Sequence, residues 1–342
     1  MRSAPQNPIP SVLRVALIGA GARGAEWLPA LLGPGAAALG VVLTAVCDLD
    51  PDSRGVSLQS AVPAGIPRLD DLAAVLALRP DILVDATSPL ARLAITRVAM
   101  RVGAHVLCAP PLAMDEDTAL ALVGAAARAR GRFAVGYQSR HRAGLRQLRA
   151  LAASGLMGRP LALRAVLGVG DDLSLQTLLS GPAAEACDAA RAILGRDAVA
   201  VRCSGPPVEA RFKIADGLTF DLAGGGGIET WHLQLESGAA MCEGGGPVRT
   251  ANGDALLAPP DAQPEGHAGA LFDLVTAIRA GGKPGAGPRG AAASLAMGLA
   301  AQRSANRGGR TEKVMPLGLM SDASQSPAAR ARRPALTPQG QE

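Results

Sequence analysis

The sequence predicts an α/β fold, a doubly wound parallel sheet followed by a second, α+β domain. Up to about residue 141, continuous apolar runs of strand length alternate with helical segments, which is typical of parallel strands covered by helices on both faces. A glycine-rich turn follows the first of these runs. Beyond residue 141, short strand-like runs are separated by tight turns, which indicates a mostly antiparallel sheet.

The apolar runs of the first domain predict strands at 13–18, 41–47, 81–86, 105–109 and 133–137. Between them, helices are predicted at 22–32, 72–78, 91–102 and 115–130. Pro110 and Pro111 end the strand at 105–109, because proline cannot donate a backbone hydrogen bond to a sheet.

The second domain is predicted to open with a connecting helix at 142–154. Its strands are predicted at 161–167, 198–203, 208–214, 218–222 and 228–236, and its further helices at 183–194, 268–280 and 290–305. The chain is thus divided into an N-terminal extension (1–12), the first domain (13–141), the second domain (142–320) and a tail (321–342). The tail is rich in Pro, Ser, Ala and Gln and is expected to be disordered.

The composition favours a globular protein of the cytoplasm. Apolar residues make up 48% and charged residues 18% of the chain. Aromatic residues make up only 2%, which leaves few stacking surfaces for nucleic acid, and the net charge of +5 comes mostly from arginine, as a compositional bias would produce. No signal peptide and no apolar stretch of membrane-spanning length is visible. We therefore expect no nucleic-acid and no membrane partner.

The cysteines favour free thiols in a reducing compartment. There are five of them, an odd number, and no Cys or His residues stand at the spacing of metal ligands. We expect no metal site.

The glycine-rich turn reads GAGARG at 19–24, the G-x-G-x-x-G pattern of a dinucleotide-binding Rossmann domain. Gly19 permits the tight turn, Gly21 lets a pyrophosphate approach the backbone, and Gly24 lets the helix pack closely on the strand. Ala22 and Arg23 complete the turn, and the free N–H groups at the helix start favour an anion.

Asp48 ends the second strand, 24 residues after Gly24. An acidic residue at about this distance accepts hydrogen bonds from the adenosine ribose of NAD. Its charge would repel the additional phosphate of NADP. The sequence therefore predicts NAD as the cofactor, with NADP possible because Arg54 lies nearby.

Several stretches together resemble the Gfo/Idh/MocA family of oxidoreductases. They include VALIGAGARG, VCDLD, RPDILVDATSPLARLAITRVAMRVGAHVLCAPPLAM and VGYQSRHRAGLRQLRALAASGLMGRP. The resemblance runs from about Leu13 to Leu317. It implies a Rossmann domain followed by an α/β domain on an open, mostly antiparallel sheet, through which such proteins often form dimers or tetramers. It also implies hydride transfer between NAD(P) and a sugar, cyclitol or related compound, with the turn at Thr87, Ser88 and Pro89 contacting the cofactor.

The catalytic positions implied by the resemblance differ in this chain. The family usually has E-K-P after the fifth strand, where this chain has Ala109, Pro110 and Pro111. Glu185 stands where a His is expected, and Asp188 is retained. The usual Lys/His proton relay is therefore absent, and general acid–base assistance is worth roughly 10²–10⁴-fold in rate.

Two groups of residues are candidates to replace the relay. Glu185 and Asp188 lie three residues apart, on one face of a predicted helix, where either carboxylate would act as a base or would simply be solvated. Tyr137 and His141 follow the last strand of the first domain and would act in proton transfer. Alternatively, Tyr137 would pack in the core and His141 would lie at the surface where a helix begins. His232 and Lys213, on predicted strands, are weaker candidates.

Two functions remain open on this evidence. The first is an NAD(P)-dependent oxidoreductase with a non-standard acid–base group. The second is a pseudoenzyme that keeps dinucleotide binding for a regulatory, scaffold or other non-redox role.

Overall fold

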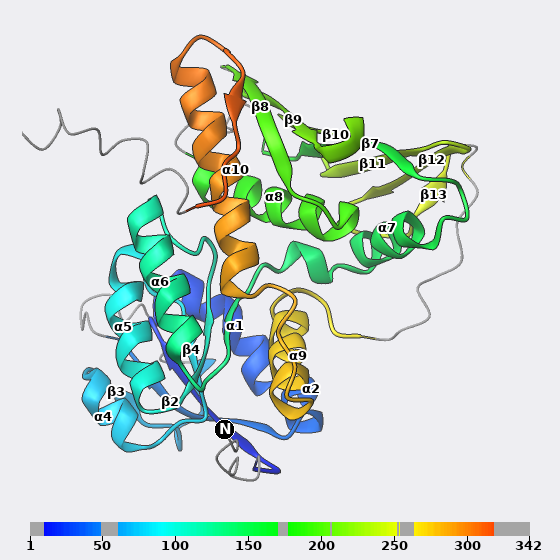
Figure 1. Cartoon of the computed structure of the whole chain (residues 1–342). Coiled ribbons are helices and arrows are strands. Elements are labelled where there is room, and N and C mark those ends of the chain that lie inside the picture. The colour runs from blue at the N-terminus through cyan, green and yellow to red at the C-terminus, as the bar shows by residue number, and fades with distance from the viewer. Residues whose placement is uncertain are drawn as a thin grey trace, which may run out of the picture.

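The computed structural model describes residues 10–48, 61–169, 177–205, 207–251, 253 and 263–317. Two sheets organise these residues, and helix α10 (Pro288–Asn306) runs from one to the other (Figure 1). The tail predicted to be disordered, 321–342, lies outside the described residues, as does Arg54.

The first sheet has six parallel strands in the order β3-β2-β1-β4-β5-β6. Their bounds are β1 Leu13–Ile18, β2 Val41–Cys47, β3 Arg68–Leu69, β4 Ile82–Asp85, β5 His105–Cys108 and β6 Phe133–Val135. The predicted doubly wound Rossmann sheet is thus confirmed. The strand order reverses between β1 and β4, and such a switch point opens a crevice for ligands at the carboxyl ends of the strands.

Helices cover both faces of the first sheet because alternate side chains of its strands point to opposite sides. Val15 and Leu17 face a core shared with α1 (Ala22–Leu32) and α2 (Pro34–Ala38). Ala16 and Ile18 face a core shared with α4 (Leu72–Ala77), α5 (Pro89–Arg101) and α6 (Glu116–Arg128).

The second sheet has eight strands in the order β13-β12-β11-β7-β10-β9-β8-β14. Their bounds are β7 Pro160–Leu167, β8 Ala198–Ser204, β9 Glu209–Ile214, β10 Thr219–Gly224, β11 Thr230–Leu235, β12 Gly238–Glu243, β13 Arg249–Thr250 and β14 Glu312–Lys313. All neighbours pair antiparallel except β7 and β10, which are parallel. The mostly antiparallel sheet is confirmed, and the chain between the strands of the one parallel pair contains α8, β8 and β9.

Helices α7 (Ala143–Ser154), α8 (Gly181–Leu194) and the second half of α10 share the apolar core of the second sheet. Helix α9 (Gly266–Arg279) follows the second sheet in the chain but packs with α1 on the first. The first half of α10 likewise contributes to the core of the first sheet. The chain therefore crosses between the two sheets three times (Figure 1). None of the described helices is both long and apolar enough to cross a membrane.

Candidate active site

The glycine-rich turn has the geometry of a phosphate-binding cradle. Gly19 has a φ of 92°, and a Cβ there would lie 2.9 Å from the backbone nitrogen of Thr87. A Cβ on Gly24 would collide with the carbonyl oxygen of Gly19. A Cβ on Gly21 would meet no atom within 4 Å, so this residue borders open space at the N-terminus of α1. Gly21 caps α1 without any side-chain hydrogen bond, which leaves the positive end of the helix dipole open to an anion.

Asp48 supports this turn. Its carboxylate oxygen Oδ2 accepts a 2.7 Å hydrogen bond from the backbone N–H of Ala20, and only 8% of the residue is exposed. The bond ties the end of β2 to the glycine turn. The hydrogen bonds expected between Asp48 and an adenosine ribose stay a prediction.

The turn after β4 lies beside the glycine turn. The backbone N–H and the hydroxyl of Thr87 both donate to Asp85, at 3.0 and 2.5 Å, and Ser88 and Pro89 begin α5. The proposed cofactor-binding residues of the two turns are thus neighbours in space.

Arg92 joins the turn after β4 to the loop after β5. Its guanidinium donates to the carbonyl oxygens of Pro111, Leu112 and Thr87, and its Nε lies 3.7 Å from the carboxylate of Asp85. Both charged groups are fully buried. Sequence reasoning did not identify Arg92, because a single Arg inside a helix is usually solvated.

A cavity of about 280 Å³ opens where the glycine turn, the loop after β5 and the start of α8 meet. Arg23, Pro110 and Glu185 line it, from these three elements respectively. Further residues of the lining are Glu26, Trp27, Ala109, Gln138, Ser139, Arg142, Gly181, Pro182, Glu229 and His267. Pro110 stands where the family resemblance implies a lysine. The loop after β5 therefore gives the cavity no ionisable side chain.

Glu185 presents a buried carboxyl group to this cavity. Its oxygens accept hydrogen bonds from the backbone N–H groups of Gln138 (3.2 Å) and Ser139 (2.9 Å). The residue is 7% exposed, and burial raises the pKa of its carboxyl from 4.5 to about 7, although the two hydrogen bonds oppose the shift. Both protonation states are therefore populated near neutral pH.

Asp188 lies one turn further along α8 but does not line the cavity. Its carboxylate is 3.0 Å from Nε of Arg140, and the hydroxyl of Ser294 donates to its other oxygen at 3.5 Å. Burial raises the pKa of Asp188, whereas Arg140 acts in the opposite direction. The geometry favours a structural role for this ion pair between α8 and the segment after β6.

Tyr137 and His141 are likewise outside the cavity lining. Tyr137 is 1% exposed within the core of the first sheet, where burial raises the pKa of its hydroxyl well above the usual range. His141 packs against Gly269 of α9. Burial, together with nearby arginines that include Arg140, lowers the pKa of His141 to about 3, so its ring stays neutral. His232 and Lys213 are exposed on the second sheet.

Several cavity residues, among them His267 and Glu229, were not identified as site residues from the sequence. His267, in the first turn of α9, lies against Trp27 with ring centroids 4.5 Å apart, and burial lowers the pKa of its imidazole. Glu229 pairs with Arg142 at 3.0 Å and accepts a hydrogen bond from the Trp231 indole at 2.6 Å. These residues come from distant parts of the chain, so no local sequence motif indicates that they line one cavity.

Comparisons with known proteins agree with this geometry. Residues 13–137 match the model of the Gfo/Idh/MocA family, described as an oxidoreductase family with an NAD-binding Rossmann fold. The resemblance stated from the sequence is thereby confirmed over the first sheet. No curated protein matches the sequence significantly.

Solved structures share the fold of most of the chain. An oxidoreductase from Agrobacterium radiobacter, in complex with NAD+, L-tartaric acid and magnesium, is 20% identical with a TM-score of 0.74, over 90% of this chain and 99% of that one. An aldose–aldose oxidoreductase from Caulobacter crescentus, with glycerol, is 22% identical with a TM-score of 0.73, over 88% and 99%. The myo-inositol dehydrogenase from Lactobacillus casei, with NAD(H) and myo-inositol, is 17% identical with a TM-score of 0.73, over 88% and 96%.

Proposed function

We propose that this chain, whose first sheet is that of the NAD-binding Gfo/Idh/MocA oxidoreductases, is an NAD-dependent oxidoreductase with Glu185 as its acid–base group. The substrate we propose is a small hydroxy or keto compound of the sugar or cyclitol class. The single observation that carries the proposal is the buried Glu185 carboxyl, with its pKa near 7, on the cavity that also borders the glycine turn.

The residues present fit a dinucleotide. The open space at Gly21 and the uncapped start of α1 suit a pyrophosphate, with Ala22 and Arg23 beside it. Asp48, at the end of β2, favours NAD over NADP through its charge. We propose that Thr87, Ser88 and Pro89 border the nicotinamide end. The bound dinucleotide would supply the hydride acceptor or donor.

Glu185 is suited to both directions of such a reaction. In oxidation, its carboxylate takes the proton of the substrate hydroxyl while the hydride leaves the carbon that carries this hydroxyl. In reduction, its protonated form returns a proton to the carbonyl oxygen. A pKa near the working pH suits a group that must both accept and donate. Other acidic residues of the cavity suit this role less, because Glu229 is paired with Arg142 and Glu26 is largely exposed.

A second function is supported by Pro110 and by the hydrogen bonds of Glu185. Proline replaces the ionisable residue expected on the cavity wall, and both Glu185 oxygens already accept backbone N–H groups. On this reading the chain binds a dinucleotide without redox turnover, in a regulatory or scaffold role.

One experiment distinguishes the two functions. The purified chain is titrated with NADH and NADPH, followed by Trp27 and nicotinamide fluorescence, and then tested for turnover with sugars, cyclitols and keto acids. Saturable NADH binding with turnover that Glu185→Gln removes supports the oxidoreductase. Binding without turnover supports the non-redox function. Absence of cofactor binding at millimolar NADH and NADPH contradicts both functions.

We also propose that the protein is cytoplasmic and forms a homo-oligomer, a dimer or tetramer, through the open face of the second sheet. That face carries polar side chains, among them Arg211 and Asp221, which are paired at 2.7 Å. Light scattering on the wild type and on Arg211→Glu tests the interface, which a monomeric wild type would contradict.

A further inference from the structure

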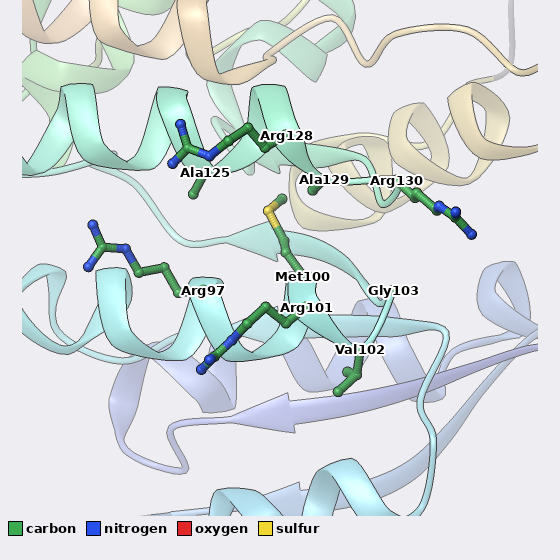
Figure 2. A pocket seen from close by; sticks show the side chains of 9 residues that line it. All are labelled: Arg97, Met100, Arg101, Val102, Gly103, Ala125, Arg128, Ala129 and Arg130. Carbon is green, nitrogen blue, oxygen red and sulfur yellow. The ribbon is translucent and has the colours of Figure 1, made fainter. Parts of the chain in front are cut away.

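A second, larger pocket lies on the first domain, between the C-terminal ends of α5 and α6. Its volume is about 780 Å³, and none of its residues lines the cavity around Glu185. Four arginines surround it, Arg97 and Arg101 from α5, Arg128 from the end of α6, and Arg130 from the loop that follows (Figure 2). We call it the arginine pocket.

No acidic group among the described residues pairs with the four arginines. All four are exposed, and none forms an ion pair or a side-chain hydrogen bond with another part of the described chain. Several arginines elsewhere have acceptors, as Arg191 has in Asp197 at 2.6 Å. Like charges around one opening repel one another, and a bound anion would relieve this repulsion.

Helix dipoles explain only part of the arrangement. Arg101 and Arg128 stand in the last turns of their helices, where a cation is favourable. Arg97 lies a turn earlier, and Arg130 lies beyond the end of α6, so neither gains from the dipole in the same way. Figure 2 shows Arg97 and Arg128 extending to the same side of the pocket from facing helices, whereas Arg130 points to the opposite end.

The pocket also has an uncharged floor. Met100 is buried, Ala125 and Ala129 are half-buried, and Val102 is exposed at the rim. A ligand that fills the pocket would therefore combine several negative charges with an uncharged, flat or apolar group. Guanidinium groups recognise phosphate oxygens through paired hydrogen bonds, and such pairs are stronger than neutral ones.

We propose that the arginine pocket binds an organic diphosphate or triphosphate, such as a nucleoside diphosphate. Its phosphates contact Arg97, Arg101 and Arg128, and its organic part covers Met100 and the two alanines. This site is separate from the glycine turn and does not depend on the proposed redox function.

The test is calorimetric titration of the full chain with ADP. Pyrophosphate, which has two phosphates as ADP has but lacks the organic part, is titrated for comparison. We expect saturable ADP binding that weakens as salt rises, that exceeds pyrophosphate binding, and that remains when NADH is present. The double variant Arg97→Ala/Arg128→Ala should weaken it at least tenfold. Arg310→Ala is the matched control, since Arg310 is also exposed and its side chain has no acceptor among the described residues, and it should bind ADP as the wild type does.

Three results would overturn the proposal: no saturable ADP binding, complete displacement of ADP by NADH, or equal binding by the double variant. Equal affinity for pyrophosphate and ADP would overturn the role of the uncharged floor. Thermal unfolding of each variant verifies that it is folded, and Arg101→Ala, also at an exposed position, provides a second variant for the same comparison.

Discussion

The carboxylate of Glu185 accepts a 2.9 Å hydrogen bond from the backbone N–H of Ser139, and this contact joins helix α8 to the segment that leaves the first sheet. The same carboxyl faces the cavity beside the glycine turn. One residue therefore belongs both to the proposed chemistry and to the junction between the two sheets. The contributions of Glu185 to turnover and to stability can be separated, because the rate of oxidation and the free energy of unfolding are expected to change with pH in opposite directions.

The first prediction concerns turnover. Oxidation needs the Glu185 carboxylate, so its rate should rise with pH through a midpoint near 7, whereas the rate of reduction should fall through the same midpoint. Glu185→Gln should lower kcat by about 10²–10⁴-fold, the usual contribution of general acid–base catalysis. NADH affinity should not change. Steady-state rates across pH, with cofactor titrations as control, check this, and an unchanged kcat in the variant removes Glu185 from the mechanism.

The second prediction concerns stability. The pKa of Glu185 is raised in the folded state from 4.5 to about 7, so within this window the folded protein holds a proton that the unfolded chain has released. The contribution of Glu185 to the free energy of unfolding should therefore fall as pH rises from 4.5 to about 7 and stay level above it. In urea unfolding, the free energy of unfolding of the wild type relative to that of Glu185→Gln should fall over this window, because His141 and the other shifted groups titrate alike in both proteins. A parallel pH dependence in both proteins would contradict the shifted pKa.

Two glycines of the turn give a matched pair for the third prediction. A Cβ on Gly24 meets the backbone of Gly19, so Gly24→Ala should lower the free energy of unfolding by about 1–3 kcal/mol. A Cβ on Gly21 meets nothing in the protein, and its backbone is in an ordinary extended conformation. Gly21→Ala should therefore keep its melting temperature and lose NADH affinity. Retained affinity in folded Gly21→Ala would show that no pyrophosphate lies at this position.

Much of this turn could be predicted from the sequence, because its chemistry is local. The positions of Gly19, Gly21 and Gly24 in the chain fix their positions in the turn. The strands with long apolar runs were predicted for the same reason, whereas β12 (GAAMCE) was missed because its small residues give no strand signal.

The cavity could be predicted only in part. Pro110 and Glu185 were found through motif positions. His267 and Glu229 reach the cavity through tertiary packing, which no local pattern encodes. His141 was a candidate for proton transfer or for a surface position, and only the structure shows that it packs against α9 with a lowered pKa.

The fourth prediction separates two roles of Asp48. Asp48→Ala leaves the N–H of Ala20 without this acceptor, which should cost about 1–3 kcal/mol of stability and weaken both NADH and NADPH binding. Asp48→Asn keeps an oxygen for Ala20 and removes the charge. It should preserve the melting temperature and reduce the preference for NADH over NADPH. If Asp48→Asn keeps the full preference in paired titrations, the charge of Asp48 does not select the cofactor.

The last prediction concerns Arg92, whose guanidinium holds the loops after β4 and β5 together from a fully buried position. Arg92→Met removes these hydrogen bonds and leaves the buried carboxylate of Asp85 without its cation, which should cost about 3–5 kcal/mol. Adding Asp85→Asn removes the unpaired buried charge but keeps an oxygen that accepts the hydrogen bonds from Thr87. The double variant should therefore be more stable than Arg92→Met alone in urea unfolding. Equal losses in the single and double variants would mean that the hydrogen bonds of Arg92 to the loop carbonyls, and not its charge beside Asp85, carry its contribution.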